Sequence, residues 1–152
     1  MHEIPPSAWL PIFSKNSLIQ RALKDDGHLL LVEDQRIPVG EKAHEHGFLV
    51  LDTAQLKTLF CITEADIHSK LFVPDDCRED GRLKAHLIAK SLLARITPAS
   101  RTNAIEQLRV EAMHQIQNIR KQAATYANGQ IHGFWTQQLA NAYLYLTENQ
   151  SS

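Results

Sequence analysis

The spacing of apolar residues along the chain changes from strand-like to helix-like. Short apolar runs bounded by turn-forming residues predict strands at 28–32 and 48–52, with a further short strand at 36–39. Ahead of them, apolar positions at helical spacing predict a short helix over 17–24 that stops at Gly27. This first half therefore favours a small sheet with at least one helix.

From Thr53 onward the apolar period is that of a helix. Two helices are predicted over 54–60 and 64–72, the second capped by Thr63. Residues 71–88 read as a strand, a polar turn and a second strand. The overlapping stretch 82–96 reads either as one helix or as a strand that runs into a helix.

A longer stripe follows a Thr97 cap with Pro98 at the first helical position. Its apolar residues are spaced by three and four: Ile105, Leu108, Ala112, Ile116, Ile119, Ala123 and Tyr126. Residues 128–133 are expected to break this helix. A last helix then has one apolar side, made of Trp135, Leu139, Ala142, Tyr143 and Leu146. We expect an antiparallel hairpin that buries both stripes.

These elements predict an α+β fold: a domain over residues 1–96 with a small antiparallel sheet and helix-turn-helix-like helices, and a helical hairpin arm over 97–152. The 152 residues, 43% hydrophobic and 22% charged, suit one domain or a small domain with an appended arm. The apolar runs are too short to cross a bilayer, so no membrane partner is expected. We read no signal peptide and no disulfide framework, and expect a cytoplasmic protein.

Charge is divided unevenly between the two halves. Residues 1–81 carry eight Lys and Arg against fourteen Asp and Glu, whereas residues 82–152 carry eight against three. The basic half can face nucleic acid or another acidic partner. It can equally face the acidic half, within one chain or across a dimer.

The stretch 56–72 meets several demands of a helix-turn-helix. Leu56 and Phe60 point inward, Cys61 supplies the small turn residue, and Ile67 falls six positions beyond it. This resembles the helix-turn-helix family, with one departure: Lys57 stands where the family prefers alanine.

The surrounding order of elements over residues 17–88 resembles a winged helix, in which a helix, a strand, two helices and a two-stranded wing follow one another. Residues 13–60 also resemble the winged-helix module at the C-terminus of conjugative relaxases, through Gly27, Ala43-His44 and Gly47-Phe48-Leu49-Val50. The winged-helix resemblance implies a nucleic-acid-binding protein, whereas no motif of the relaxase resemblance carries a function over.

Electrostatics oppose a simple DNA reader, because the second helix of the pair carries Glu64 and Asp66 and the turn after it is acidic. Nucleic acid would meet basic residues further along the chain. These candidates are Lys84, Lys90, Arg95, Arg101, Arg109, Arg120 and Lys121.

Other chemistry is sparse. His44 and His46 would project to one side of a strand and, with His68, Cys77 or His86, complete a zinc site; in a loop they would simply be solvated. No GxSxG, HExxH, P-loop or GxGxxG pattern occurs in the sequence, so we expect no enzyme, no metal and no cofactor.

Aromatic residues gather near the C-terminus: Phe134, Trp135, Tyr143 and Tyr145. In one interpretation these residues pack in the core. In the other they leave an aromatic surface for a partner or a dimer, because Trp135 and Phe134 cannot both face one core and Tyr145 lies opposite Leu146. The leading hypothesis is a small non-enzymatic binding protein of winged-helix type, which contacts nucleic acid or serves a nucleic-acid machine. The alternative is a protein-interaction module, such as an adaptor, chaperone or immunity-type inhibitor, that acts through the hairpin.

Overall fold

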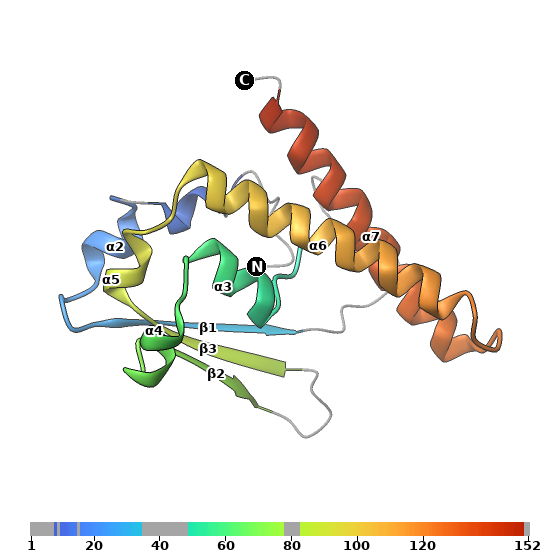
Figure 1. The fold of residues 1–152 in the computed structure, drawn as a ribbon, viewed down its shortest axis with the longest axis horizontal. Helices are drawn as coiled ribbons and strands as arrows, with labels where there is room; N and C mark the ends of the chain where they lie inside the picture. The colour runs from blue at the N-terminus through green and yellow to red at the C-terminus, as the bar shows by residue number, and fades with distance from the viewer. Residues whose placement is uncertain (1–7, 9, 15, 35–48, 78–82, 151–152) are drawn as a thin grey trace.

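The computed structural model describes residues 8, 10–14, 16–34, 49–77 and 83–150, and confirms a mixed helix and sheet fold (Figure 1). The elements in chain order are η1 (Leu10–Phe13), α2 (Leu18–Ala22), β1 (His28–Asp34), α3 (Thr53–Leu59), α4 (Glu64–His68), β2 (Phe72–Asp76), β3 (Leu83–Ala89), α5 (Lys90–Leu93), α6 (Pro98–Ile119) and α7 (Tyr126–Gln150).

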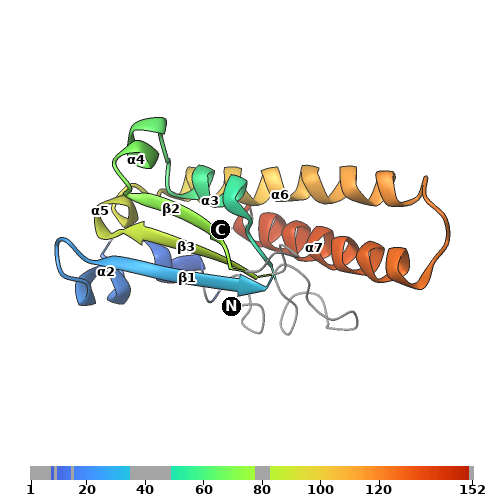
Figure 2. The same ribbon diagram turned by 90° about the horizontal axis from the view of Figure 1, so that it is seen from below.

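The three strands form one antiparallel sheet in the order β1-β3-β2. Leu31 of β1 lies opposite His86 of β3, and Phe72 of β2 lies opposite Ile88 of β3. Because side chains alternate between the two faces of a strand, Leu31, His86 and Ile88 lie on one face and are buried. Figures 1 and 2 show the helices gathered on that side of the sheet.

One hydrophobic core joins the sheet to both ends of the chain. It holds Leu56, Leu59 and Phe60 from the α3 region, Ile105 and Leu108 from α6, and Ala142, Tyr145 and Leu146 from α7. Helix α6 packs along both α3 and α7. The hairpin arm predicted over 97–152 thus contributes to the same core as residues 1–96, while the tip of the hairpin projects beyond the sheet (Figure 1).

The predicted helix-turn-helix-like pair is present, with the second helix shorter than expected. Helix α4 ends at His68, and Phe72, expected within it, begins β2. Both helices end in the same way: the N–H of Ile62 donates to Lys57 O, and that of Leu71 donates to Asp66 O. With the bonds from Cys61 N to Thr58 O and from Lys70 N to Ile67 O, each ending is a Schellman motif. This motif requires a residue in the left-handed conformation, which is Cys61 (φ 52°) after α3 and Lys70 (φ 55°) after α4.

The strand predicted at 48–52 is wrong over its described residues 49–52. Leu49, Val50 and Leu51 are buried, yet none of the described strands pairs with them. Instead the Val50 N–H donates to Gln138 Oε1 of α7 at 3.0 Å, and Asp52 caps α3. Burial of a connecting segment produced the apolar run that we interpreted as a strand. The short strand expected at 36–39 lies outside the described residues.

The hairpin forms, but its turn lies earlier than predicted. Ile105, Leu108, Ala112, Ile116 and Ile119 are all buried, as expected from the stripe. Helix α6 ends there, and α7 begins at Tyr126 rather than after residues 128–133. Thr125 Oγ1 accepts the Asn128 N–H at 3.2 Å, as an N-cap does, so Gly129 and Gly133 lie inside α7. Ala123 and Tyr126, expected in the stripe, are exposed.

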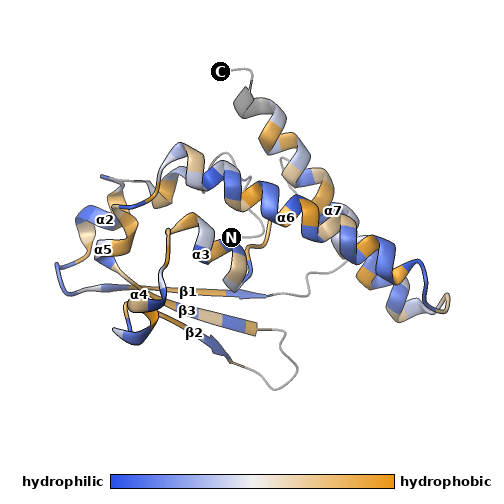
Figure 3. Cartoon of the chain, in the orientation of Figure 1, coloured by the Kyte–Doolittle hydropathy of each residue, from blue (hydrophilic) through white to orange (hydrophobic). Residues whose placement is uncertain are grey.

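Figure 3 shows apolar and polar residues interleaved along both long helices, as expected for helices packed on one side only. Within the described part of the chain, no helix is both long and apolar enough to span a bilayer.

Candidate functional site

Helix α4, the expected DNA-reading helix, is fixed to the body by one carboxylate. Asp66 accepts hydrogen bonds from the Thr63 N–H at 2.7 Å and from both terminal nitrogens of Arg95 at 2.8 and 2.9 Å. Hydrogen bonds from Arg95, and next from Thr63, hold the pKa of Asp66 well below its ordinary range. Arg95 therefore clamps α4 in place, which a bidentate guanidinium does well.

The outer face of this region has little to attract phosphate. Glu64, Asp75 and Asp76 are exposed on α4 and β2, with Lys70 as an exposed cation at the end of α4. Affinity for duplex nucleic acid comes largely from cations that neutralise phosphates. This described surface is therefore poorly suited to duplex binding.

Four of the seven predicted basic contacts have carboxylate partners within the chain. Lys84 Nζ lies 2.9 Å from Asp52 Oδ1, and Lys90 Nζ lies 3.0 Å from Asp25 Oδ1. Arg109 pairs with Glu106 one helical turn away. Together with the Asp66–Arg95 pair, these ion pairs neutralise much of the positive charge that we expected to face nucleic acid.

The remaining three do not gather at one place. Arg101 lies near the start of α6, partly buried, and its Nε has no hydrogen-bond partner among the described residues. Arg120 and Lys121 follow the end of α6, where both are exposed. At 1.5 Å per helical residue, Arg101 and Arg120 are roughly 28 Å apart along the axis. The structure thus does not bring the seven residues together.

The four predicted aromatic residues have three different environments. Trp135 packs against the main core, and Phe134 packs on Val50 with its ring edge-to-face to Trp135 at 5.1 Å. Tyr145, expected opposite Leu146, is buried beside it in the core because α7 turns Gln138, Asn141 and Tyr145 inward. Tyr143, expected inside, is 48% exposed.

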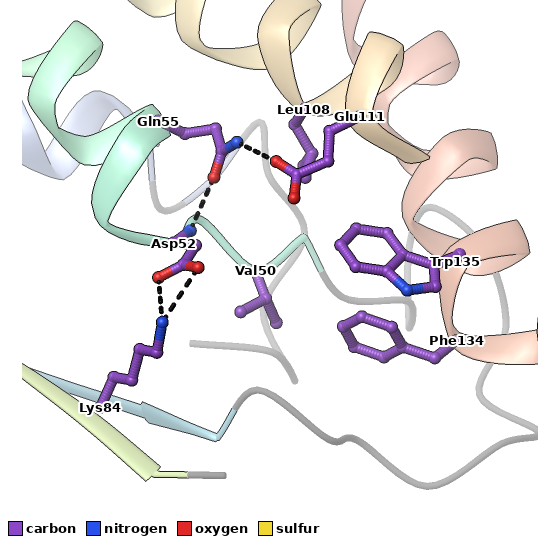
Figure 4. A pocket seen from close by; sticks show the side chains of 8 residues that line it. All are labelled: Val50, Asp52, Gln55, Lys84, Leu108, Glu111, Phe134 and Trp135. Carbon is purple, nitrogen blue, oxygen red and sulfur yellow. Dashed lines mark hydrogen bonds and ion pairs between the residues drawn. The ribbon is translucent and has the colours of Figure 1, made fainter. Parts of the chain in front are cut away.

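A pocket of about 180 Å³ lies where α3, β3, α6 and α7 meet (Figure 4). It is lined by Val50, Asp52, Gln55, Lys84, Leu108, Glu111, Phe134 and Trp135. Gln55 links two of its walls, since its Oε1 accepts the Asp52 N–H at 2.9 Å and its Nε2 donates to Glu111 Oε2 at 2.7 Å. Gln55 therefore ties the start of α3 to α6 at the pocket.

The charged groups that line this pocket largely form hydrogen bonds with one another or with neighbouring residues. Burial alone would raise the pKa of Asp52, but hydrogen bonds from Lys84 and Thr53 lower it below its ordinary value. Lys84 contacts both oxygens of Asp52, at 2.9 and 3.1 Å. Glu111 has one oxygen on Gln55 and adds a negative charge beside the Trp135 ring (Figure 4). This arrangement suits a small cationic or amide group, and the described residues that line the pocket include no Ser, Cys or His for nucleophilic chemistry.

Sequence reasoning missed most of this pocket. Val50 and Asp52 were both assigned to the strand predicted at 48–52. Gln55 and Glu111 lie on opposite helices, 56 positions apart, and no spacing rule connects them. Polar residues at the edge of the apolar stripe of α6 were the only available signal.

The proposed zinc ligands His44 and His46 lie outside the described residues. Among residues that are described, no three His, Cys, Asp or Glu side chains gather as metal ligands would. His86 is buried, with its Nε2 2.9 Å from Thr53 Oγ1. Desolvation is the main reason that the pKa of His86 lies below its ordinary value, and it favours the uncharged ring.

The outer side of the hairpin carries a cluster around Arg109, which we call the Tyr143 patch: Arg109, Val110, Met113 and Tyr143. The guanidinium lies over the Tyr143 ring, 5.4 Å from its centre, and Arg109 Nη1 lies 3.3 Å from Tyr143 Oη and 3.2 Å from Met113 Sδ. Val110 and Met113 are 54% and 38% exposed. Two helices thus present one partly apolar surface.

Comparison with protein-family models, with curated proteins and with solved structures finds no match to this chain. The functional argument therefore rests on its own residues.

Proposed function

We propose that this chain is a small non-enzymatic binding protein that acts through protein contacts, as an adaptor or accessory factor, with the α6–α7 hairpin as its contact element. The observation that carries the proposal is the Tyr143 patch. Tyr, Met and Arg are the residue types enriched at protein interfaces, and here an exposed Tyr143 and an exposed Met113 both contact a partly exposed Arg109.

The hairpin suits this role because its base is fixed. The core residues of α6 and α7, together with the Val50–Gln138 hydrogen bond, anchor it to the sheet domain. Arg109 is held by Glu106, and its stacking orders the Tyr143 ring. A pre-ordered surface loses less conformational entropy when a partner binds.

The test is affinity capture from the native host, with the tagged wild-type chain compared with Tyr143→Ala. The matched control is Tyr126→Ala, which removes an 83% exposed tyrosine from the start of the same helix. A specific partner is expected with wild type and with Tyr126→Ala, and is expected to be lost with Tyr143→Ala while the circular dichroism spectrum is unchanged. Equal capture by all three proteins would contradict the proposed contact surface.

Nucleic-acid contact is the second candidate, favoured by the order of elements. Helix α2, strand β1, helices α3 and α4, and the β2–β3 pair follow one another as in the winged-helix proteins that the sequence resembles. Fluorescence anisotropy with mixed-sequence duplex should then show binding that weakens steeply with salt and with Arg101→Glu combined with Lys121→Glu. Arg95 is unsuitable for this test because its loss would release α4. Binding that is absent or insensitive to salt removes this candidate.

A cytoplasmic location belongs to the same proposal. Cys61 and Cys77 are both exposed and free, which suits a reducing compartment. Fractionation of the native host is the direct check.

A further inference from the structure

We propose that the pocket where α3, β3, α6 and α7 meet binds a small methylated ammonium group, held between the carboxylate of Glu111 and the indole of Trp135 (Figure 4). The inference goes beyond the proposed function and is independent of it, because the Tyr143 patch shares no residue with the described lining of this pocket. It rests on the charge of the lining, on the aromatic wall beside it, and on the size of the cavity.

The described lining of the pocket carries one negative charge without a cationic partner. Its carboxylates are Asp52 and Glu111, and its ammonium group is that of Lys84. Lys84 Nζ contacts both oxygens of Asp52, at 2.9 and 3.1 Å, so these two charges are paired with each other. Glu111 is bonded only to the uncharged amide of Gln55, at 2.7 Å. The pocket therefore attracts a cation to the Glu111 side.

Aromatic side chains form the wall next to this carboxylate. The rings of Phe134 and Trp135 lie edge-to-face with 5.1 Å between their centres, and Figure 4 shows the Trp135 ring close to Glu111 on the same cavity. Tryptophan attracts cations more strongly than the other aromatic residues, and the attraction grows when the cation loses its water. A carboxylate and an indole on one cavity thus favour a positively charged ligand over a neutral ligand of the same shape.

The shortage of hydrogen-bond acceptors selects the kind of cation. Both oxygens of Asp52 accept from Lys84, and its Oδ1 also accepts the Thr53 N–H at 2.6 Å. Because Oε2 of Glu111 accepts from Gln55, the carboxylate oxygen left without a bond in the described lining is Glu111 Oε1. A primary ammonium group brings three donors, and donors buried without acceptors are costly. A methylated ammonium group carries the same charge without that need.

The cavity has room for such a group. Its volume is about 180 Å³, and a cavity of roughly 150 Å³ accommodates benzene, which is similar in size to a tetramethylated ammonium ion. Glu111 and Trp135 are both half-buried, so a ligand that contacts them need not pass through the core. The lining comes from several elements, and a bound ion that contacts α6 and α7 together should stabilise the folded chain.

The experiment titrates the isotope-labelled full chain with choline at constant ionic strength and follows its N–H signals by NMR. The side-chain signals of Trp135 and Gln55 should shift saturably, with a dissociation constant in the millimolar range or tighter. The matched probe is the uncharged analogue of choline in which carbon replaces nitrogen, and it should bind at least about ten-fold more weakly. Ethanolamine, which has hydrogens in place of the methyl groups, should also bind more weakly than choline.

Glu111→Gln is the main variant, because glutamine has the same shape and can still accept the hydrogen bond from Gln55. It should weaken choline binding about ten-fold and leave binding of the uncharged analogue unchanged, a difference that a disturbed fold would not produce. Trp135→Phe should weaken choline binding as well, since phenylalanine attracts cations less than tryptophan does. The control is Glu106→Gln, which removes a carboxylate from the same helix outside the described lining and should leave the affinity unchanged.

A peptide that carries trimethyllysine distinguishes two sources of such a group. Tighter binding than that of choline assigns a side chain of a partner protein, and weaker binding assigns a free small compound. The proposal is overturned if choline causes no saturable shift, if the uncharged analogue or ethanolamine binds as well as choline, or if Glu111→Gln binds choline like the wild type.

Discussion

Cys61 and Lys70 are the two residues that let α3 and α4 end sharply, and each does so in a backbone conformation that L-residues avoid. Their φ angles of 52° and 55° lie in the left-handed region, where a Cβ is crowded against the following carbonyl. Glycine has no Cβ and adopts this region without strain. The backbone is therefore strained at the end of α3 and at the end of α4.

Lys70→Gly is expected to stabilise the protein. Relief of the left-handed strain should raise the free energy of unfolding by about 1 kcal/mol, since the added flexibility of glycine in the unfolded chain offsets part of the gain. Urea unfolding measures the change. The control is Ser69→Gly at the adjacent helix end, where φ is −81° and no strain exists to relieve; a gain there equal to that of Lys70→Gly would refute the explanation.

His86 makes stability depend on pH near neutrality. Its pKa in the folded protein lies below the ordinary value of 6.5, mainly through desolvation, so below pH 6.5 the unfolded chain binds a proton that the folded chain does not. Stability should fall as pH drops below about 6.5, and the fall should be shallower in His86→Gln. Unfolding free energies measured between pH 7.5 and 5, roughly spanning that transition, give the slopes, and His68→Gln, which changes an exposed histidine on α4, is the control.

At the scale of elements, periodicity located the helices well and their ends poorly. The buried face of α6 was predictable because its residues recur every three or four positions across 22 residues. The turn after it was misplaced because glycines weigh heavily in sequence patterns, whereas Thr125 supplies the cap that starts α7. The apolar run at 49–51 was ambiguous from the start, because burial without strand pairing leaves the same pattern.

Gly129 in α7 provides a test of this account. It lies inside the helix, and a Cβ placed there would meet nothing within 4 Å. Gly129→Ala should therefore raise the free energy of unfolding by about 0.5–1 kcal/mol. Gly27 gives the contrast, because a Cβ there would lie 2.9 Å from the backbone oxygen of Lys24, so Gly27→Ala should destabilise. A loss of stability in Gly129→Ala would argue against a helix at that position.

The candidate sites could not be located from local sequence patterns, because they join residues from different elements. Lys84, Lys90 and Arg95 have their acidic partners 32, 65 and 29 positions away in the sequence. A basic residue and its distant carboxylate look independent until the fold joins them. The charge asymmetry between the halves was real, and these pairs show that part of it is satisfied within the chain.

For the whole molecule, the central feature is a core shared by residues on both sides of position 97. Leu56 and Phe60 pack in the same cluster as Ile105 and Tyr145. Removal of the hairpin would expose the α3 side of that cluster to water, at a cost of roughly 25 cal/mol for each Å² of apolar surface. The sheet domain and the hairpin should therefore depend on each other for stability.

A chain that ends at Ile96 is expected not to fold. Its far-UV circular dichroism should lack a cooperative thermal transition, whereas the full chain should unfold in urea with coincident curves by circular dichroism and tryptophan fluorescence. If a fragment of residues 1–96 unfolds cooperatively, then this domain is stable without the hairpin and the two predicted units fold independently.

Pro74 has a consequence for how large any assembly of this protein can become. At the β2 margin of the sheet, a proline ring nitrogen stands where an added strand would need a hydrogen-bond donor. Growth of the sheet by strand addition is therefore blocked at this position.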